Sequence, residues 1–365
     1  MVNRENYRLV KDHLRYLVEV YQLSPDSVKR YWFYLRHALI WADETPFGKA
    51  NQIRPAFPAY VSTVQTSRGG SLTAASQKKI VETTRRLFTW AKATFPQVYA
   101  KLPANWIDTL RPLRLPQQAG EHVYVTLEEV LKLISVQPEA DDFAFRRDQA
   151  AAAMLFLSGM RASAFTTLPL SAVCLTDKSI KQWPELGVKT KNGKRATSYL
   201  LPIPELLEVV AEWDSLLRVK APAESLWYPP IASSWGEQTL SVDLLPGKNR
   251  HQSLDKRLRR LFLSAGLGYK SAHKFRHGHA VYGLQHAHTM ADYKAVSLNL
   301  MHEDVKITDQ IYAPILTDEV SQRIAGMSGQ NDSRPNNELA DHLQGLSNRE
   351  LSHLMLIAAE RLGNG

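Results

Sequence analysis

The sequence predicts a mainly α-helical protein with a small β-sheet, an α+β fold arranged in two domains. Apolar residues recur at helical spacing along most of the 365-residue chain. The pair Asn192-Gly193, which is typical of a tight hairpin turn, lies in a stretch at 173–201 that we interpret as the sheet. A proline-rich, weakly periodic stretch at 103–120 interrupts the helical pattern. We expect a helical domain at 1–110, a linker at 111–121, a second domain at 122–327, and a linker with a helical tail at 328–365.

Four helices are predicted in the first domain. The first covers residues 6–21, and Ser24-Pro25 then supplies an N-cap and a proline at the first position of a helix that ends near Ala42. Two more are expected at 59–65 and 71–95. The last of these carries four basic side chains that we interpret as contacts to DNA phosphates: Lys78, Lys79, Arg85 and Arg86.

The second domain opens with a capping-box pattern, Thr126 and Glu129. An alanine-rich apolar stretch at 148–158 predicts a buried helix that carries Arg161 just beyond its end. A strand at 199–203 is expected to return from the Asn-Gly turn, followed by helices at 204–217 and 253–265, and by one that opens at His273. The helix at 253–265 is basic and includes Arg257, a further candidate for DNA contact. The stretch at 221–247 gives no clear pattern.

Composition favours an intracellular protein that binds nucleic acid. The net charge is +9, and residues 1–116 hold 18 Lys and Arg against 8 Asp and Glu, so the whole excess lies in the first third. Such an excess attracts phosphate backbones. No run of eighteen apolar residues predicts a membrane span, the N-terminus lacks the apolar segment of a signal peptide, and Cys174 is a single cysteine. We therefore expect a cytoplasmic protein without a membrane partner.

Five residues form a chemical pattern: Arg161, His273, Arg276, His302 and Tyr312. Guanidinium groups bind phosphate oxygens through several fixed N–H donors, which suits the charge that develops during phosphoryl transfer. A tyrosine with a reference pKa of about 10 needs a base or a strongly positive site before it can act as a nucleophile. Histidines supply proton transfer near neutral pH. The short helix expected at 308–311 would deliver the tyrosine.

This order and spacing resembles the tyrosine recombinases, the phage-integrase family, from about residue 6 to residue 320. The resemblance implies that Tyr312 attacks a DNA phosphate and forms a 3′-phosphotyrosine link. It implies that Arg161 and Arg276 hold the phosphate, and that His273 and His302 assist with protons and hydrogen bonds. It also implies a helical core-binding domain and a catalytic domain that close round the duplex as a C-clamp.

The resemblance places a catalytic lysine in the hairpin between the two arginines. Lys191, directly before the Asn-Gly turn, is our choice, and Lys189 and Lys194 stay open as alternatives. On this interpretation the cationic side chains supply the positive charge, so neither a metal nor another cofactor is expected. Two positions depart from the family pattern. Ala164 stands where an acidic residue is common, and Met301 stands where a glycine usually precedes the second histidine.

The expected function is site-specific recombination, for integration or excision of a mobile element of a prokaryote or phage. Its expected partners are a specific double-stranded DNA site, three further copies of the chain in a tetramer on two sites, and accessory DNA-bending proteins. The acidic tail suggests a protein contact. Two alternatives remain: a type IB topoisomerase, which shares the chemistry, and a catalytically silent DNA-binding regulator of the same fold.

Overall fold

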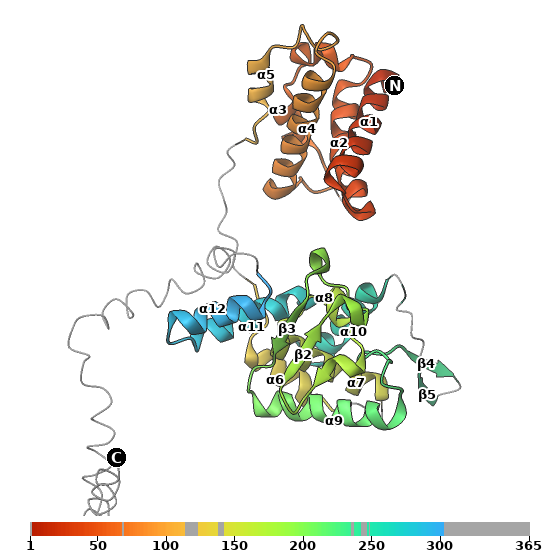
Figure 1. Ribbon diagram of the computed structural model, residues 1–365, viewed down its shortest axis with the longest axis vertical. Coiled ribbons are helices and arrows are strands. Elements are labelled where there is room, and N and C mark those ends of the chain that lie inside the picture. The colour runs from red at the N-terminus through yellow and green to blue at the C-terminus, as the bar shows by residue number, and fades with distance from the viewer. Residues whose placement is uncertain are drawn as a thin grey trace, which may run out of the picture. The chain divides into compact units, whose positions relative to one another are not determined.

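The computed structural model describes residues 2–67, 69–113, 123–137, 142–234, 237–241, 247 and 249–302. The chain is divided into two compact units, with the boundary between residues 121 and 122 (Figure 1). Most described residues are helical, and the strands form one small three-stranded sheet and one two-stranded ribbon. The predicted fold class, mainly α with a small sheet, is confirmed. Tyr312, the helix expected before it and the tail lie outside the described residues.

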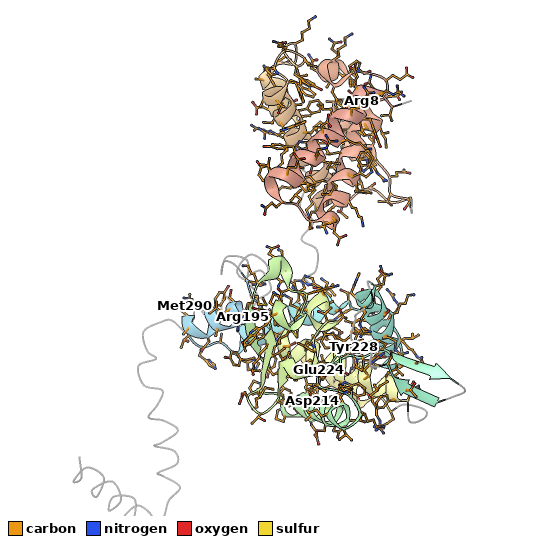
Figure 2. The ribbon with its side chains drawn as sticks, turned by 45° about the vertical axis from the view of Figure 1, so that its right-hand side comes forward. Arg8, Arg195, Asp214, Glu224, Tyr228 and Met290 are labelled. Atoms are coloured by element: carbon orange, nitrogen blue, oxygen red, sulfur yellow. The ribbon has the colours of Figure 1, made fainter. Side chains whose placement is uncertain are left out.

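The first unit is a helical bundle. Its elements are α1 (Arg4–Tyr21), α2 (Pro25–Ala42), the 3₁₀ helix η1 (Phe47–Gln52), α3 (Phe57–Thr63), α4 (Ala74–Thr94) and α5 (Ala104–Thr109). The predicted cap is confirmed, because the Ser24 hydroxyl accepts a hydrogen bond from the Ser27 N–H at 3.3 Å. Helix α4 begins at Ala74 rather than at residue 71, since Thr73 caps it. Basic residues such as Arg8 lie on the exposed side of α1 (Figure 2).

The first part of the proline-rich stretch at 103–120 is ordered against the first unit. Pro103 occupies the N-cap of α5, where the missing N–H is no loss. Ile107 and Leu110 are buried in the same hydrophobic core as Leu102. Burial of these apolar side chains therefore continues the first unit through residue 110.

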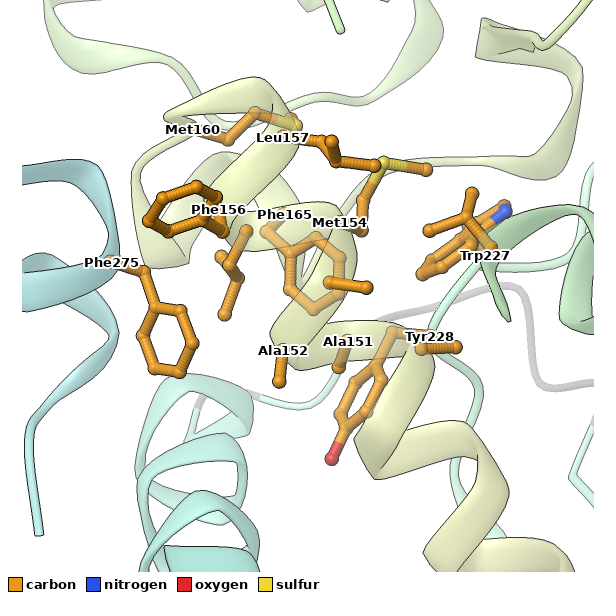
Figure 3. Close-up of a cluster of buried hydrophobic side chains, with 14 of the residues drawn as sticks. Ala151, Ala152, Met154, Phe156, Leu157, Met160, Phe165, Trp227, Tyr228 and Phe275 are labelled. Carbon is orange, nitrogen blue, oxygen red and sulfur yellow. The ribbon is translucent and has the colours of Figure 1, made fainter. Parts of the chain in front are cut away.

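The second unit is built round α7 (Phe143–Ser158), a helix buried along almost its whole length. It is surrounded by α6 (Leu127–Ser135), α9 (Pro204–Lys220), α10 (Arg250–Ser264) and α11 (Ala272–Gln285), and α8 (Ala162–Phe165) follows directly. Figure 3 shows Phe156, Phe165 and Phe275 gathered in the core beside α7. The capping box of α6 is confirmed, with both hydrogen bonds between Thr126 and Glu129 present. The predicted helices at 148–158, 204–217 and 253–265 are confirmed with longer bounds.

The three-stranded sheet consists of β1 (Val173–Cys174), β2 (Ser179–Gln182) and β3 (Ala196–Tyr199), all antiparallel. The predicted returning strand at 199–203 is wrong, because the strand ends where we expected it to begin. Asn192 and Gly193 do adopt the left-handed conformation of a tight turn. They lie, however, inside a long connection at 183–195 between the paired strands β2 and β3, rather than in a two-residue turn that joins the strands directly.

Side-chain contacts fix the ends and the middle of that connection. The Arg195 guanidinium lies over the Trp183 ring, 3.9 Å from its centre, and its NH1 lies 3.8 Å from Glu185. Val188 is buried in the core. The contacts of Arg195 therefore hold the two ends of the connection together, and Val188 anchors its middle in the core.

The elements that were not predicted from the sequence include a strand pair and a helix of the second unit. The unclear stretch at 221–247 contains an antiparallel ribbon of β4 (Ile231–Ser234) and β5 (Glu237–Leu240). Helix α12 (Met290–Asn299) follows α11 and leads to the second histidine of the motif. Among the described residues, no helix has both the length and the apolar character needed to cross a membrane.

We predict that His13 makes the first unit sensitive to acid. Its ring is 2% exposed, lies 4.8 Å from the Trp90 ring, and has no hydrogen-bond partner for either nitrogen among the described residues. Burial lowers its pKa from 6.5 to about 4. Because the unfolded chain then binds the proton more tightly, the stabilisation is complete above pH 6.5 and is lost as the pH falls toward 4.

Chemical denaturation of the wild type and His13→Phe at pH 7.5 and pH 5 measures this effect. The wild type should lose about 2 kcal/mol more than the variant at pH 5. His251→Gln, which changes an exposed histidine of α10, is the control and should follow the wild type. Equal acid sensitivity in the wild type and His13→Phe would contradict the prediction.

Candidate active site

The end of α7 is shaped for close approach by two other segments. Gly159 caps the helix with φ of +61°, a conformation that strongly favours glycine. A Cβ at this position would lie 2.8 Å from the His279 ring and 2.8 Å from the Leu300 side chain. Two residues later, Arg161 sits half-buried in extended conformation at the N-cap of α8. Glycine therefore allows the segment carrying Arg161 to meet α11 and the end of α12.

Arg276 joins these segments. It lies on α11, is 3% exposed, and donates from NH1 to the Gly159 carbonyl at 2.8 Å. From NH2 it donates to the Leu300 carbonyl. The two carbonyls belong to the ends of α7 and α12, so one guanidinium ties both helix ends together.

His302 is delivered by a Schellman motif at the end of α12. The Met301 N–H donates to the Leu298 carbonyl at 2.8 Å, and the His302 N–H donates to the Ser297 carbonyl at 3.2 Å. Met301 takes the left-handed position with φ of +52°. This motif turns the chain sharply and leaves His302 half-buried beside the site.

The electrostatics of the two histidines show which charges surround them. Burial lowers the pKa of His273, and the charges of Arg276, Lys274 and Arg161 lower it further. Burial also lowers the pKa of His302, to about 4. Four neighbouring cationic groups add to the effect on His302: Arg276, Arg161, His273 and Lys191. The imidazole of His302 is therefore neutral near pH 7, and it can accept or share a proton.

The structure thus brings together five of the six predicted catalytic residues: Arg161, Lys191, His273, Arg276 and His302. They come from the α7–α8 turn, the β2–β3 connection, α11 and the end of α12. The sixth, Tyr312, lies outside the described residues.

The three candidate lysines occupy different places on the β2–β3 connection. Lys191 is exposed and begins the 3₁₀ helix η4 (Lys191–Gly193), and its charge acts on His302. The backbone N–H of Lys189 donates to the Thr167 hydroxyl at 2.8 Å, which anchors the connection near α8. The backbone N–H of Lys194 donates to the Lys191 carbonyl at 3.4 Å. The effect of the Lys191 charge on the pKa of His302 places this lysine near the site.

Three of the four residues of α4 that are predicted to contact DNA have partners within the chain. Arg85 pairs with Asp108 at 2.7 Å, and Arg86 donates to the Tyr31 hydroxyl at 3.2 Å. Lys78 lies 3.9 Å from Glu82, and Lys79 is exposed. These exposed pairs are weak and can exchange for phosphate. Their DNA-binding role stays a prediction.

Arg257 differs from them because its partner is buried. Its Nε donates to Asp148 at 2.5 Å, and the same carboxylate accepts from Arg147 and from the Tyr228 hydroxyl. Burial, followed by the charge of Asp148, raises the pKa of Tyr228. This network ties Arg257 to the core of the second unit.

Sequence reasoning missed two residues that adjoin the site. His279 is fully buried one turn after Arg276, and burial lowers its pKa to about 4. The helical spacing between Arg276 and His279 could have identified His279 from the sequence. Asn299 at the end of α12 had no signal, since the helix itself was not predicted. Within the described part of the chain, no three His, Cys, Asp or Glu side chains are grouped to hold a metal ion.

We predict that Met301 strains the turn that carries His302. An L-residue in the left-handed region costs about 1 kcal/mol relative to glycine. Met301→Ala and Met301→Gly both remove the long side chain, but only glycine removes the strain. Met301→Gly should therefore be more stable than Met301→Ala by about 1 kcal/mol, as measured by chemical denaturation. Equal stability of the two variants would contradict the assigned backbone conformation.

No protein-family model and no curated protein matches the chain. Several solved structures match it. A lambda integrase dimer bound to a COC′ core site is 14% identical over 84% of this chain and 94% of that one, with a TM-score of 0.58. A lambda integrase tetramer bound to a Holliday junction is 15% identical over 84% and 76%, with a TM-score of 0.55. XerH recombinase in a post-cleavage complex with its difH substrate is 16% identical over 87% and 94%, with a TM-score of 0.52. The chain has the tyrosine-recombinase fold, as the order of its motif predicted.

Proposed function

We propose that this chain is a site-specific tyrosine recombinase that cuts and rejoins DNA through a 3′-phosphotyrosine intermediate. The observation that carries the proposal is the convergence of Arg161, Lys191, His273, Arg276 and His302 from four separate segments of this fold. Such a cationic group suits a phosphodiester, whose oxygens gain negative charge as a nucleophile attacks. The nucleophile on this proposal is Tyr312.

The two arginines would divide the work. Arg161 is half-buried and is the candidate for direct contact with the scissile phosphate. Arg276 is 3% exposed and bound to two carbonyls, so it would hold the site together and raise its positive potential from inside the protein. The neutral imidazole of His302 can take a proton or hydrogen-bond to the phosphate.

Lys191 would protonate the leaving 5′-oxygen, which then departs as a hydroxyl. Its ammonium stands on an exposed turn that can reach into the site. A 5′-hydroxyl of a partner strand would then attack the phosphotyrosine and reverse the reaction. The covalent link conserves the bond energy, so the reaction balances without ATP, and no metal or cofactor is proposed.

We further propose that the first unit is a core-binding domain that clamps DNA with the catalytic domain, and that the enzyme works as a tetramer on two DNA sites. The basic excess of residues 1–116 supports the first point. The dimeric and tetrameric DNA complexes named for lambda integrase support the second. Integration or excision of a mobile element, in the nucleoid of a prokaryotic cell and with accessory DNA-bending proteins, completes the proposal.

Covalent capture tests the nucleophile. Wild type and Tyr312→Phe are incubated with fragments of the DNA that flanks the native gene, with chelator and no divalent metal, and then quenched in detergent. We expect wild-type protein attached to DNA 3′ ends and no adduct from the variant, which retains DNA affinity within about twofold because it lacks only one hydroxyl.

Each other result would change the proposal. An adduct that persists in Tyr312→Phe would assign the nucleophile to another residue. Tight DNA binding by the wild type without any adduct would favour the silent regulator. Relaxation of supercoils without strand exchange between two sites would favour a type IB topoisomerase.

A leaving group that needs no proton tests Lys191. On ordinary DNA at the captured site, Lys191→Ala should slow cleavage by about 10² to 10³-fold, the range of general acid catalysis. On DNA with sulfur in place of the bridging 5′-oxygen, the rate should recover, because a thiolate leaves without protonation. Lys189→Ala and Lys194→Ala are matched controls. Recovery by sulfur in either control, and not in Lys191→Ala, would move the role to that lysine.

A further inference from the structure

The side chain of Asn299 clamps the end of α12 to the end of β3. Its Oδ1 accepts from the Tyr199 N–H at 2.6 Å, and its Nδ2 donates to the Tyr199 carbonyl at 2.9 Å. The Asn299 carbonyl also accepts from the Ser198 hydroxyl at 3.0 Å. That hydroxyl in turn accepts from Gln182 on β2 at 2.6 Å. Two residues a hundred positions apart in sequence are thereby fixed by paired hydrogen bonds.

The same amide reaches the buried His279. The Asn299 Nδ2 lies 3.2 Å from Nε2 of His279, whose Nδ1 lies 2.8 Å from the Phe156 carbonyl. A carbonyl only accepts, so Nδ1 carries the proton and Nε2 accepts from the amide. The lowered pKa of His279 agrees with this neutral form. All three contacts therefore demand one orientation of the Asn299 amide.

Asn299 lies between the turn that carries His302 and the strand that follows the connection carrying Lys191. Three residues after it, the Schellman motif delivers His302. On the other side of the clamp, β3 begins five residues after Lys191. The clamp thus fixes the end of the strand that follows the β2–β3 connection beside the segment that delivers His302.

We propose that Asn299 is a positioning residue that fixes Lys191 relative to His302, acting through Tyr199 and His279. This inference rests on the proposed function, because it assigns a role in that same reaction. Misplacing a reacting group by about 1 Å can cost about 10²-fold in rate. Without the clamp, the lysine should therefore become a poorer proton donor while the phosphate contact of Arg161 persists.

Two variants separate the hydrogen bonds from the shape. Asn299→Leu keeps a similar volume and removes every side-chain hydrogen bond. Asn299→Asp keeps the acceptor for the Tyr199 N–H and loses both donors. Met290→Ala, at the exposed start of the same helix (Figure 2), is the control. Each is assayed for cleavage of ordinary and sulfur-bridged DNA, for DNA affinity, and for histidine tautomers by ¹⁵N NMR.

We expect Asn299→Leu to slow cleavage of ordinary DNA by about 10 to 100-fold, with DNA affinity unchanged within about twofold. Sulfur-bridged DNA should recover most of that loss, as it does for Lys191→Ala. Asn299→Asp should show a similar defect, and Met290→Ala should match the wild type. The Nε2 resonance of His279 should shift in Asn299→Leu, since its amide donor is gone.

Two outcomes would overturn the inference while leaving the proposed function intact. The first is cleavage of both substrates by Asn299→Leu at the wild-type rate. The second is an equal loss of cleavage rate on both substrates, which would indicate a general structural defect. A wild type that forms no adduct would instead remove the proposed function itself. The NMR measurement is independent of cleavage, and an unshifted His279 resonance in Asn299→Leu would show that the Asn299 amide does not bind His279, which would remove His279 from the inference.

Discussion

The architecture of the candidate site depends on one buried cation held between two helix ends. Removing a guanidinium from water costs several kcal/mol unless its donors are satisfied. Arg276 meets this demand with the carbonyls of Gly159 and Leu300, which lie at the C-terminal ends of α7 and α12. Helix C-termini carry partial negative charge, so the field of both helices favours the cation. The positions of Arg161 and His302 follow, because each lies two residues beyond one of these carbonyls.

Burial then sets the protonation of the surrounding histidines. His273, His279 and His302 all have lowered pKa values, and in each case burial is the largest cause. A cationic imidazole beside two arginines would also be repelled. The site is therefore positive through its arginines and lysine, while its imidazoles remain neutral. This combination provides charge for a phosphate and proton acceptors at the same place.

Local sequence signals predicted the parts of the fold that depend on local physics. Ser24 and the Thr126–Glu129 pair marked helix starts through their own hydrogen bonds, and apolar spacing located α7. Helix α12 was not predicted because it buries little apolar surface. It is defined by a capping box at Thr289 and a Schellman turn at its end. The strand after the Asn-Gly turn was misplaced because the turn lies inside a longer connection, and pairing with β2 places the strand at Ala196–Tyr199. The order of the motif named five residues that the structure brings together, but the proposed role of Asn299 depends on a pairing across a hundred residues that no local pattern reveals.

The pairing between Asn299 and Tyr199 also has a consequence for how copies of the chain meet. An outer strand of a sheet offers unpaired N–H and C=O groups, which can template the addition of a strand from another molecule. β3 is such a strand, and the amide of Asn299 occupies both backbone groups of its last residue. The side chain of Asn299 thus makes the hydrogen bonds that a neighbouring strand would make at the end of β3. Strand addition at Tyr199 would have to displace this amide, so the clamp protects the sheet from indiscriminate association.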